Sequence, residues 1–496
     1  MRSLPHLQAA IARARMVGVP ILAIHTADPA ATIPLALKAS ASPAPPAAVA
    51  WDSSQGLFGL GQAGSQFLSG LMAAGPVSLA EALVLLQRLP ENGAAFVLGA
   101  HRFLEQPEVA QGIWNLRDAF KADGRTLILL SPHLRLPAEL AQDVLVLQEP
   151  LPGEAELSSI VQATYRHAEL EPPTDEVTRS CAAACRGLSA FAAEQALALS
   201  LHRAGVDIAS LWERKRQSVE QTPGLSFSIG GPGYESLGGL SQIKKLGAGL
   251  FAGPKPPRCI VRVDEMEKQT AGSSGDLTGI AQDFSAVLLQ AIQDYGWSGI
   301  IAVGPPGSGK SAFSKSLGGE FGVPTLGIDL GAARGSLVGE SEQNIRSVMR
   351  TIHGLAGESA FWIATCNSVT ALPPELRRRF SYGAWMFDLP LAEERSPIWE
   401  LYLRKFELSP QERPEDALWT GSDIHNCCEL AYRLGVSLKE ASGYLLPVAK
   451  SAAPSVRALR EMAEGVFLSA SYPGPYRKPD DAITPGPSAG RRIGLE

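Results

Sequence analysis

The sequence predicts an α/β protein with parallel sheets, because short apolar runs alternate with helical segments in two separate regions. In the first region, residues 19–24 (VPILAI), 94–99 (AAFVLG) and 126–130 (TLILL) have the length and aliphatic content of buried strands. A helical segment at 107–120 separates the last two, and strands that alternate with helices pair in parallel. A second region of this kind extends to about residue 390.

Length and composition bound the possibilities further. A chain of 496 residues is too long for one hydrophobic core and suggests about three compact units. The formal net charge of -6 is spread over both signs, so nucleic acid is not the expected partner. The six cysteines show neither zinc-ligand nor disulfide spacing, and we interpret them as reduced core thiols. We find no cleavable leader and no apolar run of about 20 residues, so we expect a cytoplasmic protein without membrane spans.

Two stretches of the chain resemble each other. Residues 127–157 and 361–395 both read as a strand, a polar turn, Leu-Pro-x-Glu-Leu, a second strand, and Leu-Pro before a helical region. We infer a duplicated module.

A phosphate-binding pattern lies in the second region. Residues 304–311 (GPPGSGKS) satisfy G-x-x-x-x-G-K-[ST] between the apolar run 299–303 and a helical segment at 312–321. The glycines let backbone N–H groups turn inward around a phosphate, and the helix N-terminus adds partial positive charge. We expect Lys310 to reach the β- and γ-phosphates and Ser311 to bind Mg²⁺. The alternative is a glycine-rich turn before a helix.

An acidic pair follows another short strand. Residues 259–265 (CIVRVDE) are apolar apart from Arg262, which occupies a position where an apolar residue is expected, and they end in Asp264 and Glu265. We expect Asp264 to hold the metal and Glu265 to act on the attacking water. Alternatively, the pair is the solvated start of the next helix.

The chain resembles an AAA ATPase in these motifs and in four further segments. They are residues 237–240 (LGGL), 338–342 (VGESE), 364–367 (ATCN) and 372–380 (LPPELRRRF). In ordinary AAA modules the Asp-Glu strand follows the VGESE helix, whereas here Asp264 precedes Gly304 by 40 residues. The resemblance implies a P-loop NTPase parallel sheet of the AAA type, with permuted strand order and a helical lid.

The chain is most similar to the conserved AAA proteins of cyanobacteria and plastids, which carry a degenerate AAA-like module ahead of a working one. Residues 25–29 (HTADP) stand where a P-loop is expected in the first module, and 99–102 (GAHR) stand where Asp-Glu is expected. We therefore expect no hydrolysis there. The implied division is a degenerate α/β module at 1–155, a helical lid-like region at 156–221, a linker at 222–236, the ATPase core at 237–392, a helical lid at 393–471 and a disordered tail at 472–496.

The resemblance also assigns roles to single residues. Asn367 corresponds to the residue that orients the attacking water, and Gly239 belongs to the segment that lines the adenine pocket. Arg378 and Arg379 resemble arginine fingers that enter the neighbouring subunit's site, although a solvated basic helix end is the alternative. The expected nucleotide contacts of the loop and its helix are Pro306, Gly307, Ser308, Gly309, Lys310, Ser311 and Ala312.

The sequence thus favours an AAA-class ATP hydrolase, with ATP and Mg²⁺ as cofactors, that works in a homo-oligomeric ring, a hexamer, and remodels a protein client. The alternative is a nucleotide-dependent assembly or regulatory module with little turnover. The pore position carries Leu337 instead of an aromatic residue, which weakens the case for peptide threading.

The permuted order leads to a prediction about the sheet. Asp264 can approach a metal on Ser311 only if both residues lie at the carboxyl ends of parallel strands. In an AAA sheet the strand that ends at Asn367 lies between the P-loop strand and the Asp-Glu strand. The resemblance therefore implies that residues 361–365 run between 260–263 and 300–303, all in parallel.

Overall fold

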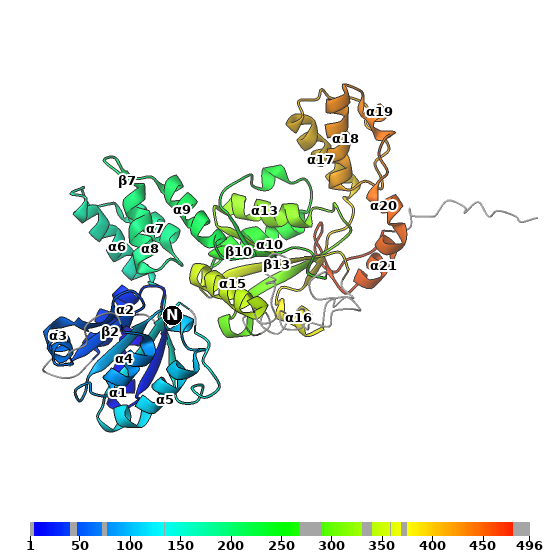
Figure 1. Ribbon diagram of the computed structural model, residues 1–496. Coiled ribbons are helices and arrows are strands. Elements are labelled where there is room, and N and C mark those ends of the chain that lie inside the picture. The colour runs from blue at the N-terminus through cyan, green and yellow to red at the C-terminus, as the bar shows by residue number, and fades with distance from the viewer. Residues whose placement is uncertain are drawn as a thin grey trace, which may run out of the picture. The chain divides into compact units, whose positions relative to one another are not determined.

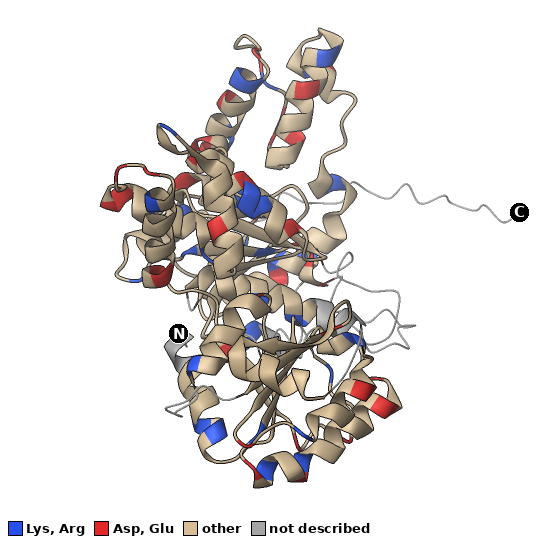
Figure 2. Cartoon of the chain, turned by 60° about the vertical axis from the view of Figure 1, so that its left-hand side comes forward, with Lys and Arg blue, Asp and Glu red and all other residues tan. Residues whose placement is uncertain are grey.

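The chain forms two compact units, Met1–Leu211 and Trp212–Glu496, and each contains a mostly parallel sheet (Figure 1). The computed structural model describes residues 4–39, 47–71, 77–132, 134–267, 290, 292–329, 340–357, 359–368 and 374–479. Acidic and basic residues are interspersed along the helices of both units (Figure 2). Among the described residues, no helix has the length and apolar character needed to span a membrane.

The first unit is built on a six-stranded sheet with the order β3-β2-β4-β5-β1-β6. Only the β2–β3 pair is antiparallel. The strands are β1 (Ile21–His25), β2 (Ala48–Asp52), β3 (Gly56–Leu60), β4 (Ala94–Leu98), β5 (Thr126–Ser131) and β6 (Leu145–Gln148). The three strands expected from the sequence therefore exist as β1, β4 and β5.

Helices cover both faces of this sheet because each carries an apolar stripe. On α5 the buried residues Val109, Ile113, Leu116 and Phe120 recur at helical spacing and pack on the sheet. Helix α4 packs on the same face, whereas α1 and α2 pack on the other face. The helices are α1 (Leu4–Met16), α2 (Pro29–Lys38), α3 (Gly61–Ser69), α4 (Leu79–Leu86) and α5 (Pro107–Ala122), with a short 3-10 turn η1 (Ala100–Arg102).

A helical region follows the first sheet, as expected for residues 156–221. It also contains a short antiparallel β7–β8 pair. Its elements are α6 (Glu154–His167), α7 (Asp175–Cys185), α8 (Ala190–Ser200), β7 (Leu201–His202), β8 (Gly205–Val206) and α9 (Ile208–Glu220).

The second unit is built on a seven-stranded sheet with the order β15-β14-β11-β13-β10-β12-β9. Strand β13 runs between β10 and β11 and is parallel to both, which confirms the predicted order. The strands are β9 (Leu225–Ser228), β10 (Cys259–Val263), β11 (Ser298–Val303), β12 (Thr325–Ile328), β13 (Ala360–Cys366), β14 (Ala384–Met386) and β15 (Leu468–Ser469).

Helices again cover both faces of the second sheet (Figure 1). Helices α10 and α13 pack on one face and α15 and α21 on the other, while α17, α18 and α19 surround a separate small core. The helices are α10 (Ser241–Ala252), α13 (Lys310–Phe321), α15 (Glu340–Ala356), α16 (Pro374–Arg379), α17 (Ala392–Lys405), α18 (Gly421–Leu434), α19 (Leu438–Ser442), α20 (Val448–Ser451) and α21 (Ala453–Ala463), with a 3-10 turn η2 (Tyr234–Ser236).

The two sheets share one spatial order. Strands β2-β4-β5-β1-β6 of the first sheet correspond in position to β12-β10-β13-β11-β14 of the second, and each sheet adds an antiparallel strand, β3 or β9, at the same edge. The repeated sequence pattern falls on equivalent elements, β5, β6 and α6 in one unit and β13, β14 and α17 in the other. This correspondence supports the duplicated module. The first sheet keeps the ordinary chain order, so only the second is permuted.

Three expected boundaries need correction. The expected linker 222–236 contributes β9, which pairs with β12 and extends the sheet. The expected lid 393–471 includes α21 and β15, which return to the core sheet because α21 buries Leu459 and Ala463 there and β15 pairs with β14. The expected disordered tail begins with an ordered segment, 472–479, that buries Tyr476, while 480–496 lies outside the described residues.

Tyr476 joins this ordered segment by a hydrogen bond to the residues that follow β14. Its hydroxyl donates to Asp388 Oδ2 at 2.6 Å, and Arg460 binds Asp388 Oδ1 at 2.9 Å. Burial, and then the nearby Asp388 carboxylate, raise the pKa of Tyr476, so the phenol remains a donor.

We predict that Tyr476→Phe lowers the free energy of unfolding by about 1 to 3 kcal/mol, because it leaves a buried carboxylate oxygen without its donor. Urea denaturation of the full chain measures the change, and Tyr432→Phe is the matched control because Tyr432 is exposed. Equal stability of the two variants contradicts the proposed contribution of this hydrogen bond.

Candidate active site

The P-loop joins β11 to α13 and curls because of its glycines. Gly307 and Gly309 have φ angles of 80° and 93°, in the left-handed region that side chains disfavour. At Gly304 a Cβ atom would lie 2.0 Å from the carbonyl oxygen of Phe387. These positions therefore require glycine, and the loop forms a cradle at the N-terminus of α13.

Two polar groups in this cradle fit a phosphate. Lys310 is buried, and its Nζ donates to the carbonyl oxygens of Gly304 at 2.7 Å and Pro305 at 2.8 Å. Burial lowers the pKa of Lys310 to about 8, against the opposing effect of nearby carboxylates, chiefly Glu267. The hydroxyl of Ser308 is buried without a hydrogen bond among the described residues. An anion would supply a charged acceptor for both groups.

The acid expected to hold a metal lies beside the P-loop helix. The hydroxyl of Ser311 donates to Asp264 Oδ1 at 3.1 Å, and Thr365 Oγ1 donates to the same oxygen at 3.2 Å. The contact is possible because Asp264 follows β10, Thr365 lies in β13 and Ser311 follows β11, in that spatial order. A hydroxyl and a carboxylate are the oxygen ligands that Mg²⁺ takes together with phosphate and water, so these residues fit that ion.

Glu265 lies at the same edge of the sheet. Its backbone has φ 50°, its side chain is exposed, and its N–H donates to Thr365 Oγ1 at 3.1 Å. Asn367 follows β13, and its N–H donates to Glu267 Oε1 at 3.0 Å. The structure thus brings Glu265 and Asn367 to the carboxyl edge through backbone contacts.

The sequence did not indicate Glu267 as a residue of the site. This carboxylate is buried, its charge acts on Lys310, and its Oε2 makes no hydrogen bond among the described residues. The sequence does contain a third acidic residue in 264–267 (DEME). Acidic residues are common at the start of a helix, so this pattern alone does not indicate a site residue.

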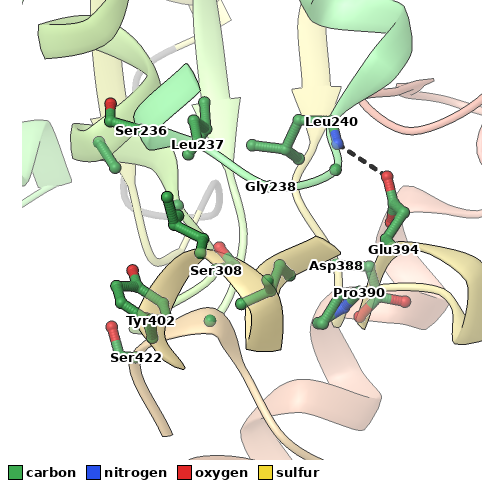
Figure 3. A pocket seen from close by; sticks show the side chains of 17 residues that line it. Ser236, Leu237, Gly238, Leu240, Ser308, Asp388, Pro390, Glu394, Tyr402 and Ser422 are labelled. Atoms are coloured by element: carbon green, nitrogen blue, oxygen red, sulfur yellow. Dashed lines mark hydrogen bonds between the residues drawn. The ribbon is translucent and has the colours of Figure 1, made fainter. Parts of the chain in front are cut away.

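A pocket adjoins the P-loop (Figure 3). Gly239 is among the residues that line it. The N–H of Leu240 donates to Glu394 Oε1 at 2.7 Å, drawn as a dashed line in Figure 3. Gly239 has φ 68°, and a Cβ there would lie 2.9 Å from Glu394, so the close approach requires glycine. The expected residues Gly307, Ser308, Gly309 and Ala312 share this pocket with Asp388, Pro390, Glu394, Tyr402 and Ser422, which the sequence did not single out.

Other expected residues lie apart from this pocket. Pro306 is exposed. Arg378 and Arg379 are exposed at the end of α16, where Arg379 donates to Gln293 Oε1 at 3.1 Å. Residues 330–339, including Leu337 and the first part of the VGESE motif, lie outside the described residues.

In the first unit, side-chain hydrogen bonds hold the segment between the equivalent strand, β1, and the helix that follows it. Helix α2 follows β1, and Asp28 caps it by accepting from the N–H of Ala31 at 3.1 Å. The Thr32 hydroxyl donates to Glu149 Oε2 at 2.9 Å, and burial raises the pKa of Glu149. The segment that follows β1 thus carries a carboxylate, Asp28, and lacks the glycines and lysine of a P-loop.

Three family models match parts of the chain. SpoVK-like AAA ATPase, N-terminal domain, matches residues 9–149, and SpoVK-like AAA ATPase, second domain, matches 154–222. The model of the ATPase family associated with various cellular activities (AAA) matches 300–357, from β11 to α15. Together with the sheet order and the P-loop, these matches make the chain similar to AAA-class P-loop proteins over residues 9–149, 154–222 and 300–357.

Individual proteins with similar sequences make the resemblance more specific. The chain is 24% identical over 373 residues to the uncharacterized AAA domain-containing protein ycf46 of Gracilaria tenuistipitata var. liui, covering 66% of this chain and 70% of that protein. It is 25% identical over 378 residues to ycf46 of Trieres chinensis, covering 66% and 68%. A shorter match, 23% over 185 residues, joins it to a katanin p60 ATPase-containing protein of Oryctolagus cuniculus, covering 27% and 38%. The resemblance to plastid-type AAA proteins is confirmed.

We predict that Lys310→Ala abolishes measurable ATP binding, with affinity at least about 100-fold weaker, because two charge-assisted hydrogen bonds of about 1.5 to 3 kcal/mol each are lost. Titration with a fluorescent ATP analogue measures the change. Lys315→Ala on the exposed side of the same helix is the matched control and should bind normally. Unchanged affinity of Lys310→Ala contradicts the phosphate-site assignment.

Proposed function

We propose that the chain hydrolyses ATP in a homo-oligomeric ring, a hexamer, and that turnover remodels a protein partner. The observation that carries this proposal is the contact of Ser311 with Asp264 next to the buried Lys310, because it brings a metal-binding pair and a phosphate-binding cation to one edge of the sheet. The AAA match over the P-loop strand and helix gives further support.

Each residue has a chemical task in this proposal. Lys310 exchanges its two carbonyl acceptors for phosphate oxygens, and the N–H groups of the P-loop bind the remaining phosphate charge. Ser311 and Asp264 hold Mg²⁺, which when bound neutralises part of the charge on the phosphates. Glu265 accepts a proton from the attacking water, and Asn367 orients that water. Gly239 and its neighbours surround the adenine.

A second function, nucleotide-dependent assembly with little turnover, draws support from Glu265. Its side chain is exposed, whereas Lys310 is buried, so the carboxylate is not enclosed together with that cation. The two functions differ in whether this carboxylate contributes to turnover.

We predict that Glu265→Gln keeps ATP binding and lowers steady-state turnover by at least about 100-fold, because the amide cannot accept the proton. Phosphate release measures turnover and a fluorescent analogue measures binding. Glu407→Gln is the matched control, since Glu407 is also an exposed glutamate with a left-handed backbone, at φ 53°. Negligible turnover of the unmodified chain, with normal binding, favours the assembly function.

We predict that the double variant Arg378→Ala, Arg379→Ala binds ATP but loses most turnover, because finger arginines stabilise transition-state charge in the neighbouring protomer. Mixing it with Lys310→Ala chains should restore part of the activity at hybrid interfaces. Arg377→Ala, which removes the neighbouring exposed arginine, is the matched control. Absence of rescue at every mixing ratio, with co-assembly demonstrated, contradicts fingers that act between protomers.

A further inference from the structure

Arg262 is a charged residue inside a central strand. It lies in β10, which pairs with β12 on one side and β13 on the other. Ile260, two residues earlier and so on the same face of the strand, packs with Phe313 and Leu317 of α13. The Arg262 side chain is 18% exposed, so its charge lies within the layer between the sheet and the P-loop helix.

The guanidinium of Arg262 binds the acid proposed to hold the metal. Arg262 Nη1 lies 3.1 Å from Asp264 Oδ2. The other carboxylate oxygen, Oδ1, accepts from Ser311 and Thr365. Both oxygens of Asp264 are therefore engaged, one by hydroxyl donors and one by a permanent positive charge.

The neighbouring strand provides room for this arginine. Gly327 of β12 pairs with Arg262 across the sheet, and a Cβ at Gly327 would lie 3.1 Å from Arg262 Nη2. A larger residue there would press on the guanidinium. Arg262 Nε is buried without a hydrogen bond among the described residues, so the ion pair with Asp264 is the arginine's principal polar contact in that part of the chain.

A fixed cation on this carboxylate has opposite effects on nucleotide and metal. The charge attracts the phosphates of a metal-free nucleotide and repels a divalent cation that approaches Asp264. Water screens both effects in part, because the Asp264 side chain is 37% exposed, but the charges are only a few ångströms apart. Mg²⁺ must also compete with the guanidinium for Oδ2 or accept a carboxylate that remains paired.

We propose that Arg262 is an internal counter-ion of Asp264 that competes with Mg²⁺ and so sets the Mg²⁺ concentration at which the site binds its metal. This inference rests on the proposed ATP and Mg²⁺ site. Arg262 acts through Asp264 and is a positioning residue. Its removal tightens metal binding and weakens binding of metal-free nucleotide, a pair of opposite changes that simple structural damage does not produce.

The test is a titration of the full chain with a fluorescent ATP analogue, first in EDTA and then at increasing Mg²⁺. Arg262→Met removes the charge and keeps an unbranched apolar side chain, and Arg262→Gln does the same with a polar end if the first variant folds poorly. Arg262→Lys keeps the charge. Lys315→Met removes one charge from the exposed side of α13 and is the matched control.

We expect the effect of Mg²⁺ on binding of the ATP analogue to be half-maximal, in the neutral variants, at a Mg²⁺ concentration about tenfold lower than in the unmodified chain. Their affinity for the analogue in EDTA should fall. Arg262→Lys and Lys315→Met should remain within about twofold of the unmodified chain. An unchanged or higher Mg²⁺ midpoint in both neutral variants, with nucleotide binding intact, overturns the role of Arg262 alone. Absence of nucleotide binding by the unmodified chain overturns the phosphate site and this inference with it.

Discussion

The structure of the site depends on one strand, β13, lying between β10 and β11. Parallel neighbours are about 4.8 Å apart, so β10 and β11 are separated by about 10 Å, a gap that two side chains can bridge. Thr365 of β13 contributes a hydroxyl in this gap, and Asp264 reaches Ser311 across it at 3.1 Å. Without this strand order, the acid and the P-loop could not share a ligand, whatever their sequence motifs.

The comparison of the two sheets shows which features of the module are fixed. Their strands occupy the same positions, but the second sheet inserts its acidic strand before the P-loop strand in the chain. The connections are therefore free to change as long as the carboxyl ends of the strands meet at one edge. In the first sheet the same edge carries no P-loop sequence, and Asp28 and Glu149 make hydrogen bonds to the first turn of the helix that follows β1.

The sequence predicted the strands around the site and the P-loop because these depend on local patterns: apolar runs, glycines at strained positions, and an acid at a strand end. The order of β10, β13 and β11 followed from the resemblance to AAA modules. The sequence did not predict contacts that arise only when distant segments meet. Glu267 reads as surface charge until β13 brings the N–H of Asn367 to it. The segment 222–236 reads as a linker because the pairing of β9 with β12 depends on the partner strand. Tyr476 reads as part of a polar tail, but it packs in the core of the second unit and donates to Asp388.

The contacts of Lys310 within its own loop affect which ligands the loop can bind. Its ammonium group already donates to the carbonyl oxygens of Gly304 and Pro305, so an incoming molecule gains little from Lys310 unless it offers stronger acceptors than two peptide carbonyls. A polyphosphate chain meets this condition through its charge, whereas a nucleoside, which carries no phosphate, does not. At the proposed phosphate site, this conformation of the loop would favour ligands that carry phosphate over those that carry none, however the base is recognised.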